Sequence, residues 1–447
     1  MVTTAMDTIC AQDGLFGYVG DSSDFLSQTE NYTQRDLSPQ KKDLLSIAHL
    51  VRRYHRGLEE PVRIVNMIYD RIDNYKEGDF EGWTCLQSRE TVIADAEALS
   101  VRYKDKHCLP TLFGVPFAVQ DAFDVAGIPT AAGAQGHSYT PTTTAPAVQA
   151  LLDAGAIFVG KLNSEMLKTG VFDLPAPHDT SSSAHALEGS SAHSTGPAAA
   201  VSAGLVSFIL RTDTTGESLP PCRSNGVVTL KTTKGTIPTQ GVVSISPSLD
   251  TISITAQSVE DARTVWLELQ KCDNSTEPYV KPFASLPTWH VDSRDTSSWK
   301  SRFRFAVSPG FLGDTACSPK HAKLLGETVK SLESCGGRRV EIDYEPFETA
   351  SKLLVPNDTA APNLLVLEHI ATIGTDTIER NLATMHLGQQ EIYKHQLSAS
   401  TFKPWEIFQS QARLAECARK AQTLFDPLNS SYQCSGSLRG HRKCWFS

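Results

Sequence analysis

The sequence predicts an α/β fold with a parallel, doubly wound core. Residues 198–210 (AAAVSAGLVSFIL) are apolar enough to form a buried helix that runs into a buried strand. From Leu109 onward, short apolar runs alternate with glycine and proline, which is typical of strands and turns. A helix is expected over residues 145–154, ending at Gly155 and leading into a strand over 156–159. Strand, helix and strand in that order indicate the α/β class.

The N-terminal part of the sequence predicts a helical region that precedes this core. Residues 1–40 are polar and irregular, and are expected to be a leader segment. Apolar residues then recur at helical spacing from Leu44 to Val51, and further helices are expected near residues 62–75 and 88–103. The main domain is predicted to span residues 41–425.

Later segments continue the alternation of strands and helices. Strands are expected at residues 226–230, 241–245, 302–307 and 339–342, and helices at 259–270, 319–335 and 404–425. Residues 171–190 are rich in serine, proline and alanine and predict a surface loop, and residues 426–447 predict an irregular tail.

Composition narrows the class of protein. The formal net charge of -9 argues against nucleic-acid and anionic-membrane partners, which require clustered lysine and arginine. The N-terminus has neither a basic segment nor an apolar segment of signal-peptide type, so a cytoplasmic location is expected. The ten cysteines are scattered singly, without metal-ligand spacing, so neither a metal nor a cofactor is predicted.

Five segments together carry a family resemblance: FGVPFAVQDAFDVAGIPTAAG, PAVQALLDAGAIFVGKLNSEM, KTTKGTIPTQGVVSISPSLDTISITAQSVEDA, FRFAVSPGFLGD and GGRRVEIDYEPFETASKLL. The chain resembles the amidase signature family over residues 40–425, and within it the allophanate hydrolases. The resemblance implies a three-layer α/β/α sandwich around a mixed central sheet, and hydrolysis of an amide or ureido C–N bond. It also implies an incomplete C-terminal end, because the family continues past the last helix. A natural truncation, a shifted reading frame and an unspliced intron remain open as the cause.

In that family a serine attacks the carbonyl carbon, a second serine on a cis peptide relays the proton, and a lysine is the base. All three positions are substituted here. Gln120 stands at the lysine position, and Glu217 stands at the nucleophile position after Thr212-Asp213-Thr214-Thr215-Gly216. An alignment without gaps places His193 at the position of the relay serine.

Two alternative registers compete with this alignment. Gly189-Ser190-Ser191 also resembles the family's relay segment, but using it requires a three-residue insertion that rotates the apolar stripe of the following helix. A one-residue slip would make Ser218 the nucleophile, yet Pro221 matches the family's proline only when Glu217 holds that position. His193 and Glu217 are therefore preferred.

The substrate side also departs from the family. Leu219 and Pro247 stand where the resemblance places two arginines, and neither can hold a carboxylate by paired hydrogen bonds. Allophanate is therefore a poor substrate candidate.

The residues around these positions have expected roles. Thr214, Thr215 and Gly216 are expected to keep the oxyanion loop, with Ser194 and Ser218 beside the site. Asp213 is expected to bond local backbone N–H groups. Scaffold roles are expected for Asp121, His137 and Lys161. Cys222 is expected to be a small buried side chain.

Three hypotheses of function follow. The first is acid–base chemistry on a small metabolite, with Glu217 as base and His193 as proton partner. The second is a non-catalytic amidase-like protein that binds a ligand or partner. The third is a residual C–N hydrolase that uses Ser194 or Ser218. The expected partner is a small-molecule substrate or ligand, and a homodimer is left open.

Overall fold

The computed structural model describes residues 45–76, 82–133, 138–163, 195–272, 277, 279, 304–307, 319–354, 362–382, 387–398 and 404–424. The chain divides into two units. The sheet unit comprises Gln34–Phe283 and Glu368–Lys394, and the helical unit comprises Met1–Thr33, Ala284–Leu367 and His395–Ser447. The expected leader (1–40), the loop at 171–190 and the tail (426–447) lie outside the described residues, so these three expectations stay predictions.

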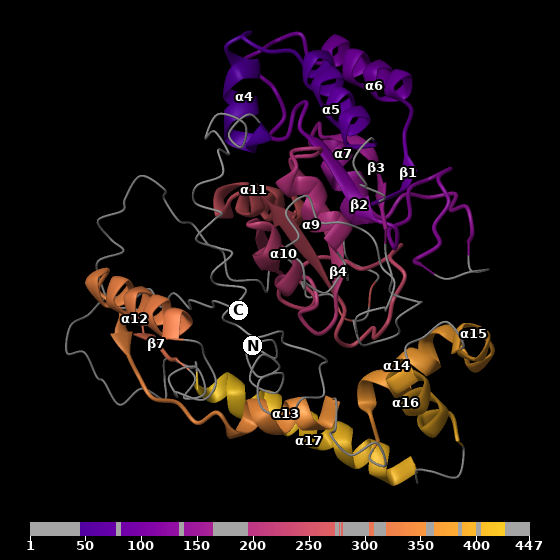
Figure 1. Cartoon of the computed structure of the whole chain (residues 1–447), viewed down its shortest axis with the longest axis vertical. Helices are drawn as coiled ribbons and strands as arrows, with labels where there is room; N and C mark the ends of the chain where they lie inside the picture. Colours follow the sequence, from indigo (N-terminus) through magenta and orange to yellow (C-terminus); the bar gives the residue numbers. More distant parts are fainter. Residues whose placement is uncertain are drawn as a thin grey trace. The chain divides into compact units, whose positions relative to one another are not determined.

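A six-stranded sheet organises the sheet unit (Figure 1). In spatial order its strands are β1 (Trp83–Leu86), β3 (Ile157–Leu162), β2 (Pro116–Gln120), β4 (Phe208–Asp213), β6 (Thr251–Ala256) and β5 (Val228–Lys231). Strands β3, β2 and β4 run parallel, whereas β1, β6 and β5 pair antiparallel to their neighbours. The sheet is therefore mixed, as the family resemblance implies. The parallel core expected from the strand-helix-strand pattern is confirmed in the central strands β3, β2 and β4.

Both faces of the central strands are buried. On one face the rings of Phe117 and Phe208 stack at 5.4 Å between centroids, and Phe158 meets Phe117 edge-on at 5.8 Å. The next residues along these strands point to the opposite face, where Ala118 and Ile209 join a core cluster with residues of the N-terminal helices. Strands buried on both faces read as continuous apolar runs. This arrangement confirms the layered α/β fold.

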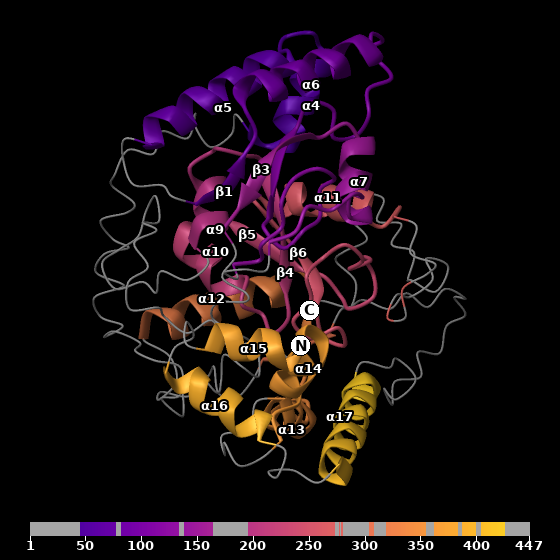
Figure 2. The ribbon, with the colours of Figure 1, turned by 90° about the vertical axis from the view of Figure 1, so that its right-hand side faces the viewer.

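Most helices of this unit lie close to their predicted positions, but the helices at residues 219–225, 364–373, 375–381 and 387–397 were not predicted. The helices within the unit are α4 (Ile47–His55), α5 (Pro61–Lys76), α6 (Arg89–Arg102), α7 (Pro146–Asp153), α9 (Thr195–Ser202), α10 (Leu219–Asn225), α11 (Val259–Leu269) and α15 (Thr375–Asn381). Helices α5 and α6 lie side by side (Figure 2). Helices α14 (Leu364–Ile373) and α16 (Leu387–Leu397) cross the division between the units.

One predicted strand is wrong, and two strands, β1 and β6, were not predicted. Residues 241–245 form only an isolated bridge between Val242 and Phe123, because the chain there turns around a buried carboxylate: the Ile245 amide donates to Asp250 Oδ2. Strand β6 was not predicted, although its sequence, TISITA, has the alternation of polar and apolar residues that is typical of a strand; all six residues are buried.

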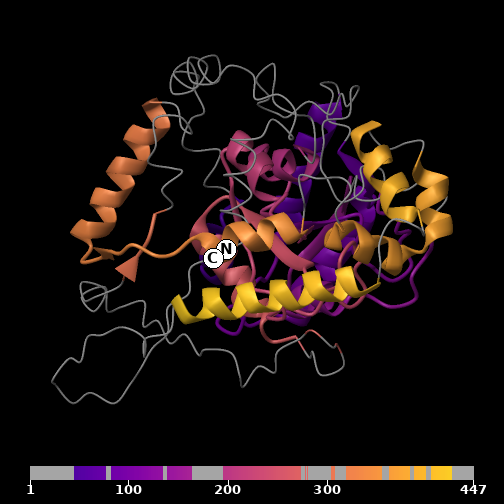
Figure 3. The same ribbon diagram turned by 90° about the horizontal axis from the view of Figure 1, so that it is seen from below.

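The helical unit contains a short parallel pair and two packed helices. Strands β7 (Arg304–Phe305) and β8 (Arg338–Arg339) flank α12 (Pro319–Ser334), which confirms the predicted strand-helix-strand order with much shorter strands. Helix α13 (Glu345–Leu354) packs along α17 (Pro404–Leu424) (Figure 3). In the part of the chain that the structure describes, no helix is long and apolar enough to span a membrane.

A buried histidine and tyrosine join α14 to α16 within the sheet unit. His369 Nδ1 lies 2.6 Å from the Tyr393 hydroxyl oxygen, and both side chains are fully buried. Burial lowers the pKa of His369 to about 4. The neutral imidazole is therefore the form that fits this packed contact.

This contact predicts acid sensitivity. As the pH drops from about 6.5 toward 4, His369 becomes protonated in the unfolded chain, where its pKa is about 6.5, but stays neutral in the folded protein. The free energy of unfolding therefore falls over this pH range. Between about pH 7 and pH 5 the free energy of unfolding falls by about 2 kcal/mol, because pH 5 lies about 1.5 pH units below the pKa of the unfolded histidine. Urea unfolding should show this slope, and His369→Gln should lack it. An unchanged slope in the variant would contradict the assignment.

Candidate functional site

The candidate site lies where β4 ends and the chain turns into α10. Asp213, the last residue of β4, is fully buried. Its Oδ1 accepts a hydrogen bond from the Gly216 amide at 2.7 Å, and its Oδ2 accepts one from the Ser218 hydroxyl. Gly216 has a φ of 104°, a conformation that favours glycine. The predicted local role of Asp213 is thereby confirmed.

Lys231 neutralises this buried carboxylate. Its Nζ lies 2.5 Å from Asp213 Oδ1 and donates to the Asp213 carbonyl oxygen at 2.9 Å. Lys231 ends β5, two strands away from β4 in the sheet. A buried carboxylate is costly unless it is paired and hydrogen-bonded, and this one is both.

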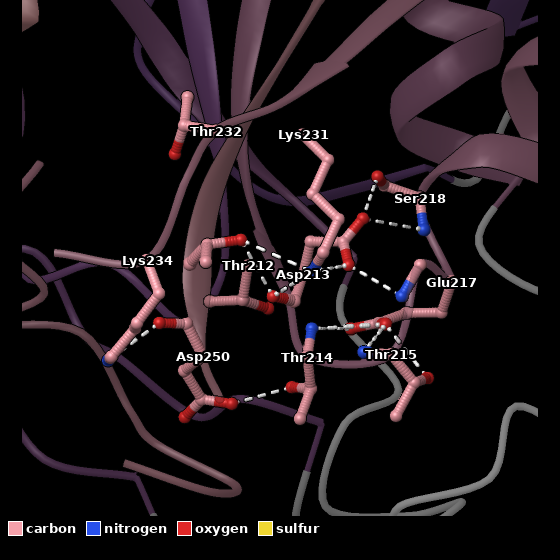
Figure 4. A network of polar contacts seen from close by, with 12 residues as sticks. Thr212, Asp213, Thr214, Thr215, Glu217, Ser218, Lys231, Thr232, Lys234 and Asp250 are labelled. Carbon is pink, nitrogen blue, oxygen red and sulfur yellow. Dashed lines mark hydrogen bonds and ion pairs between the residues drawn. The ribbon is translucent and has the colours of Figure 1, made fainter. Parts of the chain in front are cut away.

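The Glu217 side chain folds back onto the loop that precedes it (Figure 4). Its carboxylate accepts from the Thr214 amide at 2.8 and 3.1 Å, and from the Thr215 amide at 2.8 Å. The Thr215 hydroxyl adds a longer contact of 3.3 Å. Successive backbone N–H groups that converge in this way form an anion-binding nest. Of the three residues expected to keep the oxyanion loop, Thr214 and Thr215 donate their amides to Glu217, and Gly216 donates its amide to Asp213.

Gln120 ties two central strands together. It ends β2 with its side chain buried, and its Oε1 accepts from the Thr212 amide at 2.9 Å and from the Thr212 hydroxyl at 3.0 Å. A primary amide does not titrate near neutral pH and cannot accept the proton that the family's lysine accepts. In this geometry Gln120 links β2 to β4 by hydrogen bonds beside the site.

A second buried carboxylate fixes the loop from behind. Asp250 Oδ1 accepts from the Thr214 hydroxyl at 2.6 Å, and its Oδ2 accepts from the Ile245 and Ser246 amides at 2.9 and 3.0 Å. Burial raises the pKa of Asp250, and these donors oppose the rise. Lys234 donates to the Asp250 carbonyl oxygen at 2.8 Å, and burial lowers the pKa of its ammonium group.

A third carboxylate holds the turn around Pro247. Glu368, from α14, accepts from the Ser246 hydroxyl at 2.6 Å and from the Ser248 amide at 2.7 Å. Glu368 lies 120 or more residues further along the chain than these two serines. An acidic group therefore lies beside one position where the resemblance places an arginine.

The structure gathers most of the predicted site residues. Thr214, Thr215, Gly216, Glu217 and Ser218 form one turn, and Gln120 reaches the same strand through Thr212. Ser218 is fully buried. His193, Ser194 and His137 lie outside the described residues, so their roles stay predictions.

The scaffold residues form a separate buried group. Lys161 Nζ donates to Thr130 Oγ1 at 2.7 Å and to the Pro129 carbonyl oxygen at 2.8 Å, and lies 3.4 Å from Asp121 Oδ1. Burial lowers the pKa of Lys161 and raises that of Asp121. Cys222 is buried, as expected.

Sequence analysis missed three residues that build the site: Lys231, Asp250 and Glu368. Lys231 and Asp250 lie in segments that carry the family resemblance, which is a signal that could have found them. Glu368 lies far along the chain from the serines that it holds, and no local pattern marks it.

The amidase family profile, described as "Amidase", matches residues 63–428. The chain therefore belongs to the amidase family. It is 33% identical over 276 residues to urea amidolyase of Saccharomyces cerevisiae, covering 61% of this chain and 14% of that protein. It is 33% identical over 303 residues to urea amidolyase of Lachancea kluyveri, covering 67% of this chain and 16% of that protein.

A solved allophanate hydrolase from Kluyveromyces lactis shares the fold. The two superpose with a TM-score of 0.65 and 23% identity, covering 85% of this chain and 59% of the other. The chain thus spans a small part of the urea amidolyases and less than two thirds of this hydrolase.

Removing the Glu217 carboxylate should open the nest. Glu217→Ala leaves the Thr214 and Thr215 amides without their acceptor, which costs about 1–3 kcal/mol in the free energy of unfolding. Formate can fill the vacancy, so sodium formate should raise the melting temperature of Glu217→Ala above a matched sodium chloride series. Glu217→Gln, which keeps an acceptor oxygen, is the matched control. Equal responses to formate in all three proteins would count against the nest.

Proposed function

We propose that this chain is a non-hydrolytic amidase-family protein that binds a small amide or ureido compound. The ligand class is carried over from the chemistry named for its relatives, urea amidolyase and allophanate hydrolase. The observation that carries the proposal is the Glu217 carboxylate on the Thr214 and Thr215 amides.

The Thr214 and Thr215 amides cannot donate to an oxyanion while they donate to Glu217. Acyl transfer develops a negative charge on the carbonyl oxygen, and the family stabilises it with backbone N–H groups of this loop. Two negative charges about 4 Å apart repel by about 4 kcal/mol at an effective dielectric constant of 20. That repulsion is about a thousandfold in rate.

The other residues around the Glu217 loop also argue against hydrolysis. Gln120 supplies no base, and its oxygen is held by Thr212. Ser218 is fully buried, and its hydroxyl donates to Asp213. The acidic Glu368 near Pro247 favours an uncharged ligand over a carboxylate.

One observation favours acid–base chemistry as a second candidate. Glu217 is only partly buried, so its carboxylate remains within reach of a ligand that enters from solvent. A positioned carboxylate can remove and return a proton, with His193 as the proposed partner. Turnover of a small amide or ureido compound that Glu217→Gln abolishes, while binding persists, would favour this candidate over pure binding.

A serine-directed fluorophosphonate probe tests the main proposal. We expect no labelling of the unaltered chain, because glutamine and glutamate stand at the family's base and nucleophile positions. The triple variant Gln120→Lys, His193→Ser, Glu217→Ser restores the three family residue types and should be labelled at position 217, as mass spectrometry of the peptide would show.

The double variant Gln120→Lys, His193→Ser is the matched control, because it keeps Glu217 and should stay unlabelled. Labelling of the unaltered chain at Ser194 or Ser218 would instead support a residual hydrolase and overturn the proposal.

A further inference from the structure

The C-terminal ends of helices α4 and α6 meet in the sheet unit. Tyr54 of α4 and Tyr103, which follows α6, both meet Phe113 edge-on, at 5.5 and 6.0 Å between ring centroids. The end of α4 also touches the loop after α6, where His55 Nδ1 lies 2.5 Å from the Lys106 carbonyl oxygen. Helices α4, α5 and α6 lie together at one end of the unit (Figure 2). Residues that are 51 positions apart in the sequence therefore share one surface.

This surface gathers basic side chains, and we call residues 52–60 and 101–108 the basic surface. Its exposed basic side chains are Arg52, His55, Arg56, Arg102, Lys104, Lys106 and His107. The described residues place no carboxylate in ion-pair contact with Arg56, Lys104 or Lys106. These cations are unpaired in a chain that has more acidic than basic residues, so they remain available to an anionic partner.

Lys106 lies against the turn that follows α4. Gly57 in this turn has a φ of 63°, and a Cβ atom added there would lie 2.7 Å from Lys106 Nζ. Glycine therefore suits this position both by its backbone conformation and by the space that it leaves. The ammonium group of Lys106 thus lies against the turn that carries Arg56 and Leu58.

Helix geometry explains only part of the cluster. Cations near a helix C-terminus are stabilised by the helix dipole, which accounts for Arg52 and Arg102 in the last turns of α4 and α6. The dipole acts within about one turn of the helix end. Lys104 and Lys106 lie in the loop beyond α6, and local helix stability gives no reason for the exposed charge of Lys106 in particular.

The net charge of the chain does not describe this surface. The basic surface holds six lysine and arginine residues against three acidic residues, a formal charge of +3, whereas the whole chain carries -9. Charges are screened beyond about 8 Å at physiological ionic strength. A partner that touches the basic surface therefore meets a positive charge, although the chain as a whole is acidic.

Two large aliphatic side chains are exposed among these cations. Leu58, in the turn after α4, is 54% exposed, and Val101, in the last turn of α6, is 66% exposed. Cations that meet phosphate groups beside aliphatic side chains that enter the headgroup region are typical of a lipid-binding surface. Single-stranded nucleic acid would favour exposed aromatic side chains for stacking, and a protein interface would disfavour lysine. An anionic lipid surface is therefore the partner that fits best.

We propose that the basic surface binds membranes that contain anionic phospholipids. This proposal is independent of the function proposed for the Glu217 loop. Each lysine or arginine beside an anionic membrane strengthens binding about fivefold, so a net charge of +3 gives a preference of about 100-fold over a neutral membrane. The binding is reversible and weakens as the salt concentration rises.

Sedimentation of the full chain with sucrose-loaded vesicles tests the proposal. Vesicles of phosphatidylcholine with about 30% phosphatidylserine are compared with vesicles of phosphatidylcholine alone. We expect a partition coefficient about 100-fold higher for the anionic vesicles, and loss of this preference in about 0.5 M sodium chloride. Equal partitioning into both kinds of vesicle would overturn the proposal.

Charge reversal locates the binding surface. The double variant Lys104→Glu, Lys106→Glu makes the basic surface acidic and should abolish the preference for anionic vesicles. Lys323→Glu, Lys330→Glu is the matched control, because both lysines are exposed on α12 and the change in net charge is the same. All four lysines are exposed, so both variants should melt like the unaltered chain. Equal losses of vesicle binding in the two variants would count against this surface.

Poly-L-glutamate separates a lipid partner from an acidic protein partner. We expect the unaltered chain to prefer anionic vesicles as described above. Binding of poly-L-glutamate that depends on Lys104 and Lys106, without a preference for anionic vesicles, would overturn the proposal and assign the basic surface to an acidic polypeptide.

Discussion

The candidate site depends on the buried carboxylate of Asp213. It ends a strand that is buried on both faces, and a charge in that position persists only with full compensation. Lys231 supplies the opposite charge, while Gly216 and Ser218 supply the hydrogen bonds. These contacts fix the turn between β4 and α10. The direction of the loop amides, and therefore the anion-binding nest, follows from them.

Two more carboxylates extend the same principle around this turn. Asp250 holds Thr214 from behind, and Glu217 accepts from the Thr214 and Thr215 amides on the other side. The backbone groups of a short irregular loop are thus satisfied by acidic side chains where regular secondary structure is absent. The arrangement directs the Thr214 and Thr215 amides at the Glu217 carboxylate.

Family membership does not by itself fix the catalytic chemistry of this chain. The layered core is that of an amidase-family fold, and it rests on apolar packing such as the Phe117–Phe208 stack. Packing of this kind survives the substitution of a few polar residues at the end of a strand. Function has to be argued from the site itself, where Gln120 and Glu217 make contacts that a lysine base and a serine nucleophile would not make.

The sequence by itself determined the fold class, most helices and the positions of Gln120 and Glu217, because apolar periodicity and segment resemblance are local properties of a chain. Strand β6 at TISITA was overlooked although the alternation of its residues is visible in the sequence, and the turn at residues 241–245, which forms around a carboxylate, could not be foreseen. Only the tertiary structure decided that Glu217 closes back on its own loop and that Glu368 holds Ser246. Hydrogen bonds of this kind depend on which backbone groups converge in space, and local sequence does not encode that.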